Sequence, residues 1–122
     1  MQEPNDLTSA CIEGIQDKKG TGIAIIDLSG IESAPASGMI VCEGRNPLQV
    51  AAIADSLQDT ALSRCGRRPE NTDGYRNSQW IVVDYGDTIV HVFQKEERLR
   101  YDIEGLWNDA VITEIPDPDG PA

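Results

Sequence analysis

Residues 80–93 read WIVVDYGDTIVHVF, the most apolar and most β-branched run in the chain. Most of its residues are β-branched or aromatic, a composition typical of strands. Gly86 and Asp87 interrupt it near the middle, and glycine stands first, as a two-residue type II′ turn requires. The stretch therefore predicts a β-hairpin with strands Trp80–Asp84 and Thr88–Phe93.

The two faces of this hairpin differ in character. The expected register pairs Trp80 with Phe93 and Val82 with His91, and side chains alternate between the faces along each strand. One face is aliphatic and suits a core packed against helices: Ile81, Val83, Tyr85, Val90 and Val92. The other face mixes large aromatic rings with ionisable groups: Trp80, Val82, Asp84, Ile89, His91 and Phe93.

The mixed face allows two interpretations. Aromatic residues are enriched at protein interfaces, so the face can be a binding surface. Alternatively, a helix covers it, His91 is hydrogen-bonded inside the protein and Asp84 holds the turn. All the aromatic residues lie between residues 75 and 107, which favours a binding surface built by the second half of the chain.

Helix and strand signals elsewhere predict a single α/β domain. Asn46 and Pro47 start the clearest helix, and Gly66 can end it with a positive φ. The remaining elements are expected as a helix over 5–19, strands over 22–28 and 39–42, a segment over 66–79 that is mainly loop with room for a short strand near Arg68, and helical segments at 96–100 and 104–109. We expect the domain to span residues 1–112, followed by a disordered, acidic, proline-rich tail over 113–122.

The length and charge of the chain exclude some classes of function. A chain of 122 residues suits one domain with one core. Its net charge of -11 repels phosphate backbones, which argues against nucleic-acid binding and favours basic protein partners. The first residues are neither a signal nor a transit peptide, and no apolar run reaches the length of a membrane helix. Cys11, Cys42 and Cys65 are widely spaced, as expected for free thiols in a reducing cytoplasm.

The sequence carries no strong catalytic or cofactor motif. A single histidine and the lack of a CxxC pair argue against a zinc site, and no phosphate-binding glycine loop is present. An acid–base or metal site could be imagined from Asp84, Asp87, His91, Asp102 and Glu104, but their spacing is a weak signal. Aspartates that flank a turn usually serve the turn itself. We therefore expect no catalysis, no cofactor and no metal.

Several segments form a long ordered series of specific residues. They are 25–30 (IIDLSG), 40–44 (IVCEG), 49–54 (QVAAIA), 80–87 (WIVVDYGD), 90–93 (VHVF), 98–104 (RLRYDIE) and 106–107 (LW). Together they resemble the ribosomal silencing factor family, RsfS, also called the Iojap-related proteins. The resemblance runs from the first expected helix to Trp107, and chance agreement over so many ordered positions is negligible.

The resemblance implies an α/β domain with a mixed sheet, related in topology to nucleotidyltransferases but without their catalytic residues. It implies a non-enzymatic, cytoplasmic homodimer that binds the large ribosomal subunit through large-subunit protein number fourteen, on the intersubunit face. Such binding blocks small-subunit joining and represses translation, and organellar relatives assist ribosome biogenesis. The partner-binding residues implied by analogy are Trp80, Asp84, Tyr85, His91, Phe93, Tyr101 and Trp107.

Two other functions stay open at this point. One is an acidic dimeric interaction module, or a large-subunit assembly factor, of the same fold. The more remote one is a nucleotidyltransferase-like enzyme, which needs a Gly-Ser loop and two or three carboxylates that hold magnesium on adjacent strands. Gly44-Arg45 lacks the serine, and no Asp-x-Asp lies on either early strand. The enzyme is therefore disfavoured.

Overall fold

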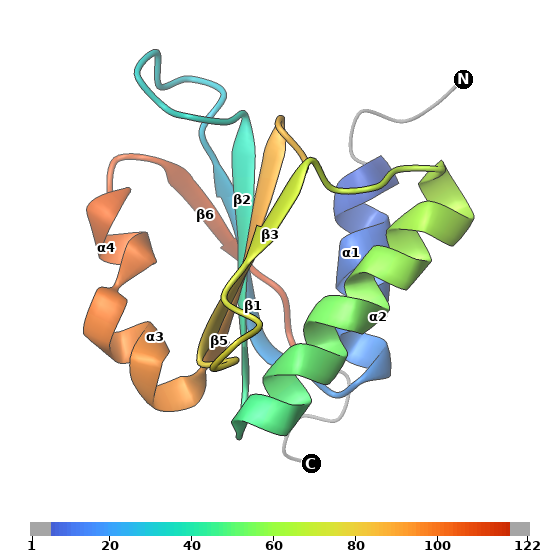
Figure 1. Ribbon diagram of the computed structural model, residues 1–122. Helices are drawn as coiled ribbons and strands as arrows, with labels where there is room; N and C mark the ends of the chain where they lie inside the picture. Colours follow the sequence, from blue (N-terminus) through green and yellow to red (C-terminus); the bar gives the residue numbers. More distant parts are fainter. Residues whose placement is uncertain (1–5, 118–122) are drawn as a thin grey trace.

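The computed structural model describes residues 6–117 as three layers, with a sheet between two layers of helices (Figure 1). The elements are α1 (Asp6–Asp17), β1 (Thr21–Asp27), β2 (Gly38–Gly44), α2 (Pro47–Cys65), β3 (Asn71–Asp73), β4 (Trp80–Asp84), β5 (Thr88–Gln94), α3 (Lys95–Tyr101), α4 (Ile103–Leu106) and β6 (Val111–Glu114). The strand order is β3-β4-β5-β2-β1-β6. β2 and β5 run parallel while the other neighbours run antiparallel, so the sheet is mixed and the expected fold class is confirmed.

β4 and β5 form the predicted hairpin in the predicted register. Trp80 lies opposite Phe93, and Val82 lies opposite His91. Gly86 has a φ of 89°, in the positive region that the first position of this turn demands. Asp84 Oδ1 accepts a hydrogen bond from the Gly86 N–H at 2.8 Å, so this carboxylate holds the turn.

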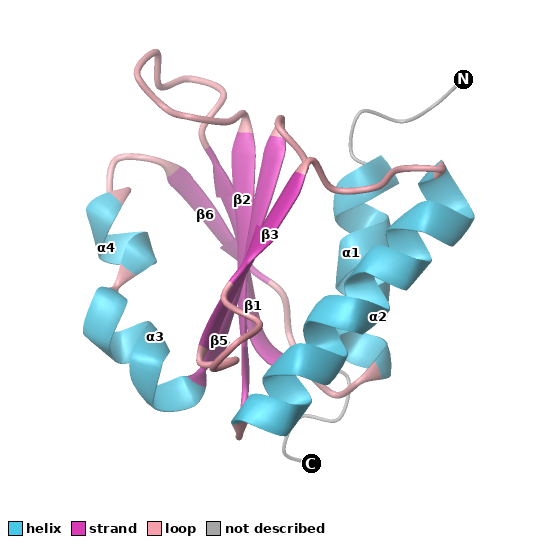
Figure 2. Cartoon of the chain, in the orientation of Figure 1, coloured by secondary structure: helices cyan, strands magenta, loops and turns pink. Residues whose placement is uncertain are grey.

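The helices α1 and α2 cover one face of the sheet (Figure 2). All the side chains expected to point that way are buried: Ile81, Val83, Tyr85, Val90 and Val92. The two helices approach closely because Gly14 has no side chain, and a Cβ there would lie 2.6 Å from the Leu57 Cα. Ser56 Oγ donates a hydrogen bond to the Gly14 carbonyl oxygen at 2.8 Å across the same contact.

The longest helix, α2, begins and ends as predicted. Asn46 Oδ1 accepts a hydrogen bond from the Gln49 N–H at 2.9 Å, and Gln49 Oε1 accepts one from the Arg45 N–H at 2.7 Å. Gly66 follows the helix with a φ of 65°. In contrast, the expected start of α1 at Asn5 lies outside the described residues.

A second core lies on the opposite face of the sheet, under α3 and α4. Its buried members are Ile26, Leu28, Met39, Val41 and Phe93. Arg98 of α3 anchors this layer: Nη1 donates to the Gly22 carbonyl oxygen at 2.5 Å and to Glu43 at 3.0 Å, and Nη2 donates to Glu104 at 2.7 Å. The Arg98 side chain is only 13% exposed, so these contacts hold α3 firmly to β1 and β2.

His91 is buried in this second layer in its neutral form. Its exposed fraction is 6%, and its Nδ1 accepts a hydrogen bond from the Trp80 indole N–H at 3.1 Å. Burial lowers the pKa of His91 to about 4 because the charged imidazolium loses its hydration. The imidazole therefore remains an acceptor for Trp80 throughout the neutral pH range.

The predicted tail begins too early. Thr113 and Glu114 belong to β6 and pair with Ile25 and Ala24 at the edge of the sheet. The chain stays attached beyond the strand, because the Ile115 N–H donates to the carbonyl oxygen of Ile23 at 2.8 Å. The boundary at residue 112 is therefore wrong, since the backbone hydrogen bonds of β1 order a segment whose prolines and acidic residues suggested disorder. Residues 118–122 lie outside the described part of the chain.

Replacing Gly14 with alanine tests the contact between α1 and α2. Alanine favours a helix by up to about 1 kcal/mol over glycine, but here its Cβ meets rigid backbone of α2. We expect Gly14→Ala to lower the free energy of unfolding by about 1–3 kcal/mol in urea titrations. Gly30→Ala is the control, because a Cβ there meets nothing within 4 Å and should change stability little. Equal stabilities of the two variants would contradict the close packing.

Because His91 is buried in its neutral form, we expect the free energy of unfolding to depend on pH. The pKa of His91 is lower in the folded state than its ordinary value of 6.5, so the unfolded chain binds a proton first as the pH falls. The contribution of neutral His91 to the free energy of unfolding is complete above about pH 6.5. About 2 kcal/mol of this contribution is lost by about pH 5. His91→Asn keeps an acceptor for Trp80 but cannot titrate.

The expected result is a difference in unfolding free energy between wild type and His91→Asn that shifts by this amount between about pH 7 and pH 5. Both proteins carry the same carboxylates, so their titration cancels in the comparison. A difference that stays constant with pH would show that His91 is not held neutral.

Candidate functional site

Four aromatic rings from three elements gather at one end of the second layer. Trp80 and Phe93 stack across the hairpin with ring centroids 5.0 Å apart, and Tyr101 at the end of α3 lies 4.5 Å from Trp80. His91 stands next to them, 5.9 Å from Trp80 and 6.1 Å from Phe93. The hairpin register brings three of the rings together, and the anchoring of α3 adds the fourth.

The hydrogen bond between Trp80 and His91 fixes the orientation of the indole. The Trp80 N–H donates inward to His91 Nδ1 at 3.1 Å, so the proton of the neutral imidazole sits on Nε2. That Nε2 is buried and has no hydrogen-bond partner in the described structure. The only polar atom of the Trp80 side chain is therefore hydrogen-bonded inside the protein. The ring carbons are left to face outward.

The residues predicted for partner binding fall into an outer and an inner set. Tyr101 is 47% exposed, and Trp80 and Trp107 are partly exposed on the same layer. Phe93 is 0% exposed, and His91 lies beneath Trp80. Contact with a partner stays a prediction for the outer three, while the inner two can act only by supporting them.

Two further predicted residues stand apart from this cluster. Tyr85 is buried on the opposite face of the sheet, where the Arg67 guanidinium lies 5.8 Å from its ring centroid. Asp84 is partly buried and holds the hairpin turn. The interpretation that helices cover this face therefore fits Asp84, His91 and Phe93. The interpretation of an open aromatic surface fits Trp80 and Tyr101.

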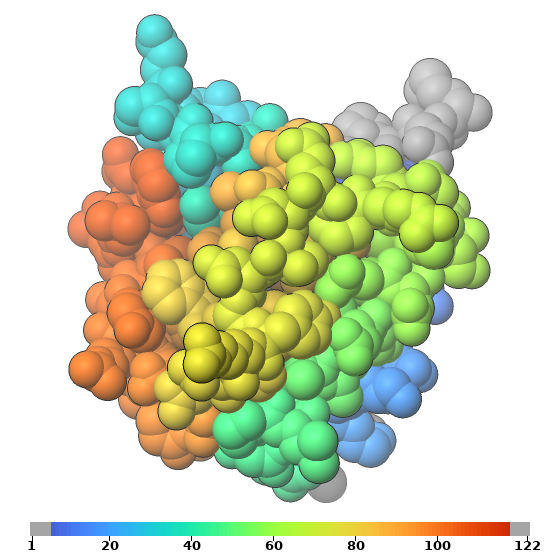
Figure 3. Space-filling model, in the orientation of Figure 1, coloured from blue at the N-terminus to red at the C-terminus, as the bar shows by residue number. Residues whose placement is uncertain are grey.

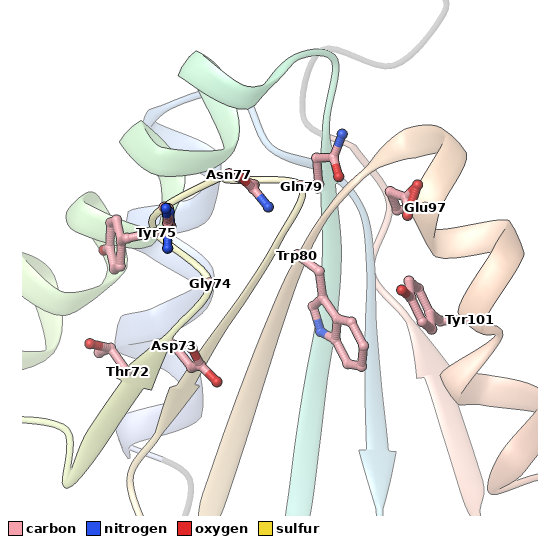
Figure 4. A pocket seen from close by; sticks show the side chains of 10 residues that line it. Thr72, Asp73, Gly74, Tyr75, Asn77, Gln79, Trp80, Glu97 and Tyr101 are labelled. Carbon is pink, nitrogen blue, oxygen red and sulfur yellow. The ribbon is translucent and has the colours of Figure 1, made fainter.

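A cavity of about 540 Å³ opens beside Trp80, between the β3–β4 connection and α3 (Figure 4). Trp80 and Tyr101 line it together with Asp73, Arg76 and Glu97. In the space-filling view, the β3–β4 segment (yellow) lies at the surface between α2 (green) and α3–α4 (orange) (Figure 3). No local sequence pattern points to Glu97 in this site, because only the packing of α3 against the sheet places it there.

The β3–β4 connection forms a rigid wall of this cavity. Gly74 has a φ of 98°, and a Cβ there would collide with the Trp80 carbonyl oxygen. The Ser78 N–H donates to the Gly74 carbonyl oxygen at 2.9 Å, and Ser78 Oγ donates to that of Tyr75 at 2.9 Å. The Tyr75 hydroxyl donates to Asp55 of α2 at 2.7 Å, so the connection is tied to the helix layer as well.

The described residues form a surface that could bind a partner, but their side chains are not grouped in a way that suits metal chemistry. Within residues 6–117, no group of three or more His, Cys, Asp or Glu side chains could hold a metal ion. Burial raises the pKa of the Cys11 thiol to about 12 and that of Cys42 well above its ordinary value, so neither is a reactive thiolate. No helix over the same range is both long and apolar enough to span a membrane.

Comparison with known proteins gives a consistent result. A family model described as "Ribosomal silencing factor during starvation" matches residues 1–121. The chain is 34% identical over 110 residues to ribosomal silencing factor RsfS of Halalkalibacterium halodurans, covering 90% of this chain and 92% of that protein. It is 37% identical over 99 residues to RsfS of Bacillus subtilis, covering 81% and 82%.

A solved structure agrees with these relatives. The crystal structure of a Chromobacterium violaceum protein superposes with a TM-score of 0.81 at 32% identity, covering 97% of this chain and 98% of that one. The family match over nearly the whole chain, the relatives and the shared fold lead to one conclusion. The chain belongs to the RsfS family of ribosomal silencing factors.

Proposed function

We propose that this protein represses translation by binding the large ribosomal subunit through large-subunit protein number fourteen and blocking small-subunit joining. The family is non-catalytic, so its members act by binding. Steric exclusion requires only affinity and position, because a bound domain of this size occupies surface that the small subunit needs. The same proposal places the protein in the cytoplasm.

The observation that carries this proposal is the pair of outward aromatic rings on a rigid base. Trp80 and Tyr101 reach the surface, while Phe93 and His91 hold Trp80 from below. Ring surfaces that are ordered before binding lose little entropy on association, and tryptophan and tyrosine are common binding hot spots. A rigid aromatic patch is therefore well suited to anchor the protein on its partner.

The charge of the chain supports a protein partner over bare RNA. The net charge of -11 attracts a basic ribosomal protein and accelerates encounter at low salt. The same charge repels the phosphates of exposed ribosomal RNA. A role in ribosome biogenesis uses the same contact with the large subunit, and differs only in the stage at which the protein binds.

We also propose that the protein is a homodimer. Three large apolar side chains are exposed around α4: Leu99, Leu106 and Val111. Large apolar side chains left exposed on consecutive elements, here α3, α4 and β6, are candidates for a protein interface. A second copy of the chain, with the same patch, would cover them by a symmetric contact.

Truncation of Trp80 tests the binding surface. We expect Trp80→Ala to weaken binding to purified large subunits by about thirtyfold, in line with loss of a hot-spot residue. Sucrose-gradient sedimentation with separated subunits measures both binding and the block of subunit joining. Leu48→Ala is the matched control, because Leu48 is exposed at the start of α2, on the other side of the sheet.

Tyr101→Ala extends this test without disturbing the core, since Tyr101 is about half exposed. It should reduce binding while the circular dichroism melting curve stays close to wild type. Normal binding and normal inhibition of joining by both Trp80→Ala and Tyr101→Ala would place the contact elsewhere.

The dimer has its own test in light scattering coupled to size-exclusion chromatography. Wild type should elute as a dimer, and Leu99→Glu combined with Leu106→Glu should elute as a folded monomer, because two charges would be buried at the contact. Leu48→Glu introduces the same charge away from the patch and should leave the dimer intact. A monomeric wild type, or a double variant that remains dimeric, would contradict the assignment.

A further inference from the structure

We infer that the cavity beside Trp80 receives an arginine side chain of the protein partner. This inference rests on the proposed function, because it names the chemical group that the binding surface recognises. The lining combines the two outward aromatic rings with two carboxylates, Asp73 from β3 and Glu97 from α3 (Figure 4). Guanidinium groups stack on aromatic faces and form hydrogen bonds to carboxylates, so this lining matches an arginine.

The aromatic rings that line the cavity are arranged so that they can bind a cation. The Trp80 N–H is used by His91, so the indole contributes its ring to the cavity rather than a competing donor. The faces of tryptophan and tyrosine rings carry partial negative charge, which attracts a guanidinium group. Trp80 and Tyr101 are already in contact with each other, so neither has to be ordered when the arginine enters.

The carboxylates of the cavity are available to a new partner. Glu97 is only 18% exposed, and its one ion pair among the described residues is a long contact of 3.7 Å with Arg100, which is itself largely solvated. Asp73 is exposed and forms no ion pair with any residue from 6 to 117. A partly desolvated carboxylate without a close cation gains more from an incoming guanidinium than a fully solvated one does.

The size and rigidity of the cavity also suit an arginine side chain. A volume of about 540 Å³ holds one long side chain and the water molecules around it. The wall formed by the β3–β4 connection is held by Gly74 and Ser78, so the shape exists before the partner arrives. A preformed cavity reduces the ordering cost of binding.

The lining also contains Arg76, and this residue separates two kinds of occupant. A nucleotide of ribosomal RNA could stack on Trp80 and place its phosphate near Arg76. The lining carries two carboxylates against one guanidinium, and the whole chain is strongly acidic, so the balance of charge favours a cation. Removal of Arg76 should then strengthen binding of an arginine, whereas it would weaken binding of a phosphate.

The first experiment measures binding of the full chain to purified large subunits. We expect Asp73→Asn combined with Glu97→Gln to weaken binding about tenfold or more, because two charge-assisted contacts are lost. Asp17→Asn combined with Asp59→Asn makes the same change in net charge on α1 and α2, and should alter binding less than about twofold. Arg76→Gln should strengthen binding.

Each other outcome of this experiment overturns the inference. Equal losses in the two double variants would show that only long-range charge matters. Unchanged binding by Asp73→Asn with Glu97→Gln would remove the cavity from the interface. Stronger binding by that variant, with weaker binding by Arg76→Gln, would identify a phosphate in place of the arginine.

The second experiment needs no ribosome and separates failure of this inference from failure of the proposed function. N-acetyl-arginine methylamide is titrated into the ¹⁵N-labelled chain, and the neutral citrulline analogue serves as the matched control. The Trp80 indole N–H signal, assigned with Trp80→Phe, should shift towards saturation with arginine only. The shift should disappear in Asp73→Asn with Glu97→Gln, and equal responses to arginine and citrulline would overturn the inference even if the chain binds large subunits.

Discussion

The hydrogen bond from the Trp80 indole to His91 is the contact on which the aromatic surface of Trp80 and Tyr101 depends. It exists because the hairpin register places the two residues on one face, and because burial keeps the imidazole neutral. It turns the polar atom of Trp80 inward and leaves its ring to line a cavity. With Phe93 stacked beneath, the ring is held from two sides, and the binding that we propose would start from a preformed anchor.

The fold could be predicted where the signals are local. The alternation in residues 80–93 determines which side chains face α1 and α2, and Gly86 with Asp87 determines the register of the hairpin. Asn46 and Gly66 mark the ends of α2 because caps act within a few residues. The family resemblance, quoted from the same residues, is confirmed by a match along nearly the whole chain.

The candidate site was less predictable because it depends on contacts between distant parts of the chain. Alternation places Trp80, His91 and Phe93 on one face, but exposure depends on where α3 and α4 lie. Arg98 fixes that position by reaching Gly22, which is 76 residues away. The same long-range packing buries Phe93, exposes Tyr101 and brings Glu97 to the cavity, and pairing with β1 likewise orders β6. No local pattern in the sequence carries this information.

A cryo-electron microscopy structure of the protein bound to the large ribosomal subunit would show directly whether the Trp80 surface makes the contact. We expect the β3–β4 connection and α3 to face a basic protein of the intersubunit surface, with the Trp80 ring covered and its indole N–H still directed at His91. A complex in which α1 and α2 face the ribosome and Trp80 remains in solvent would contradict it.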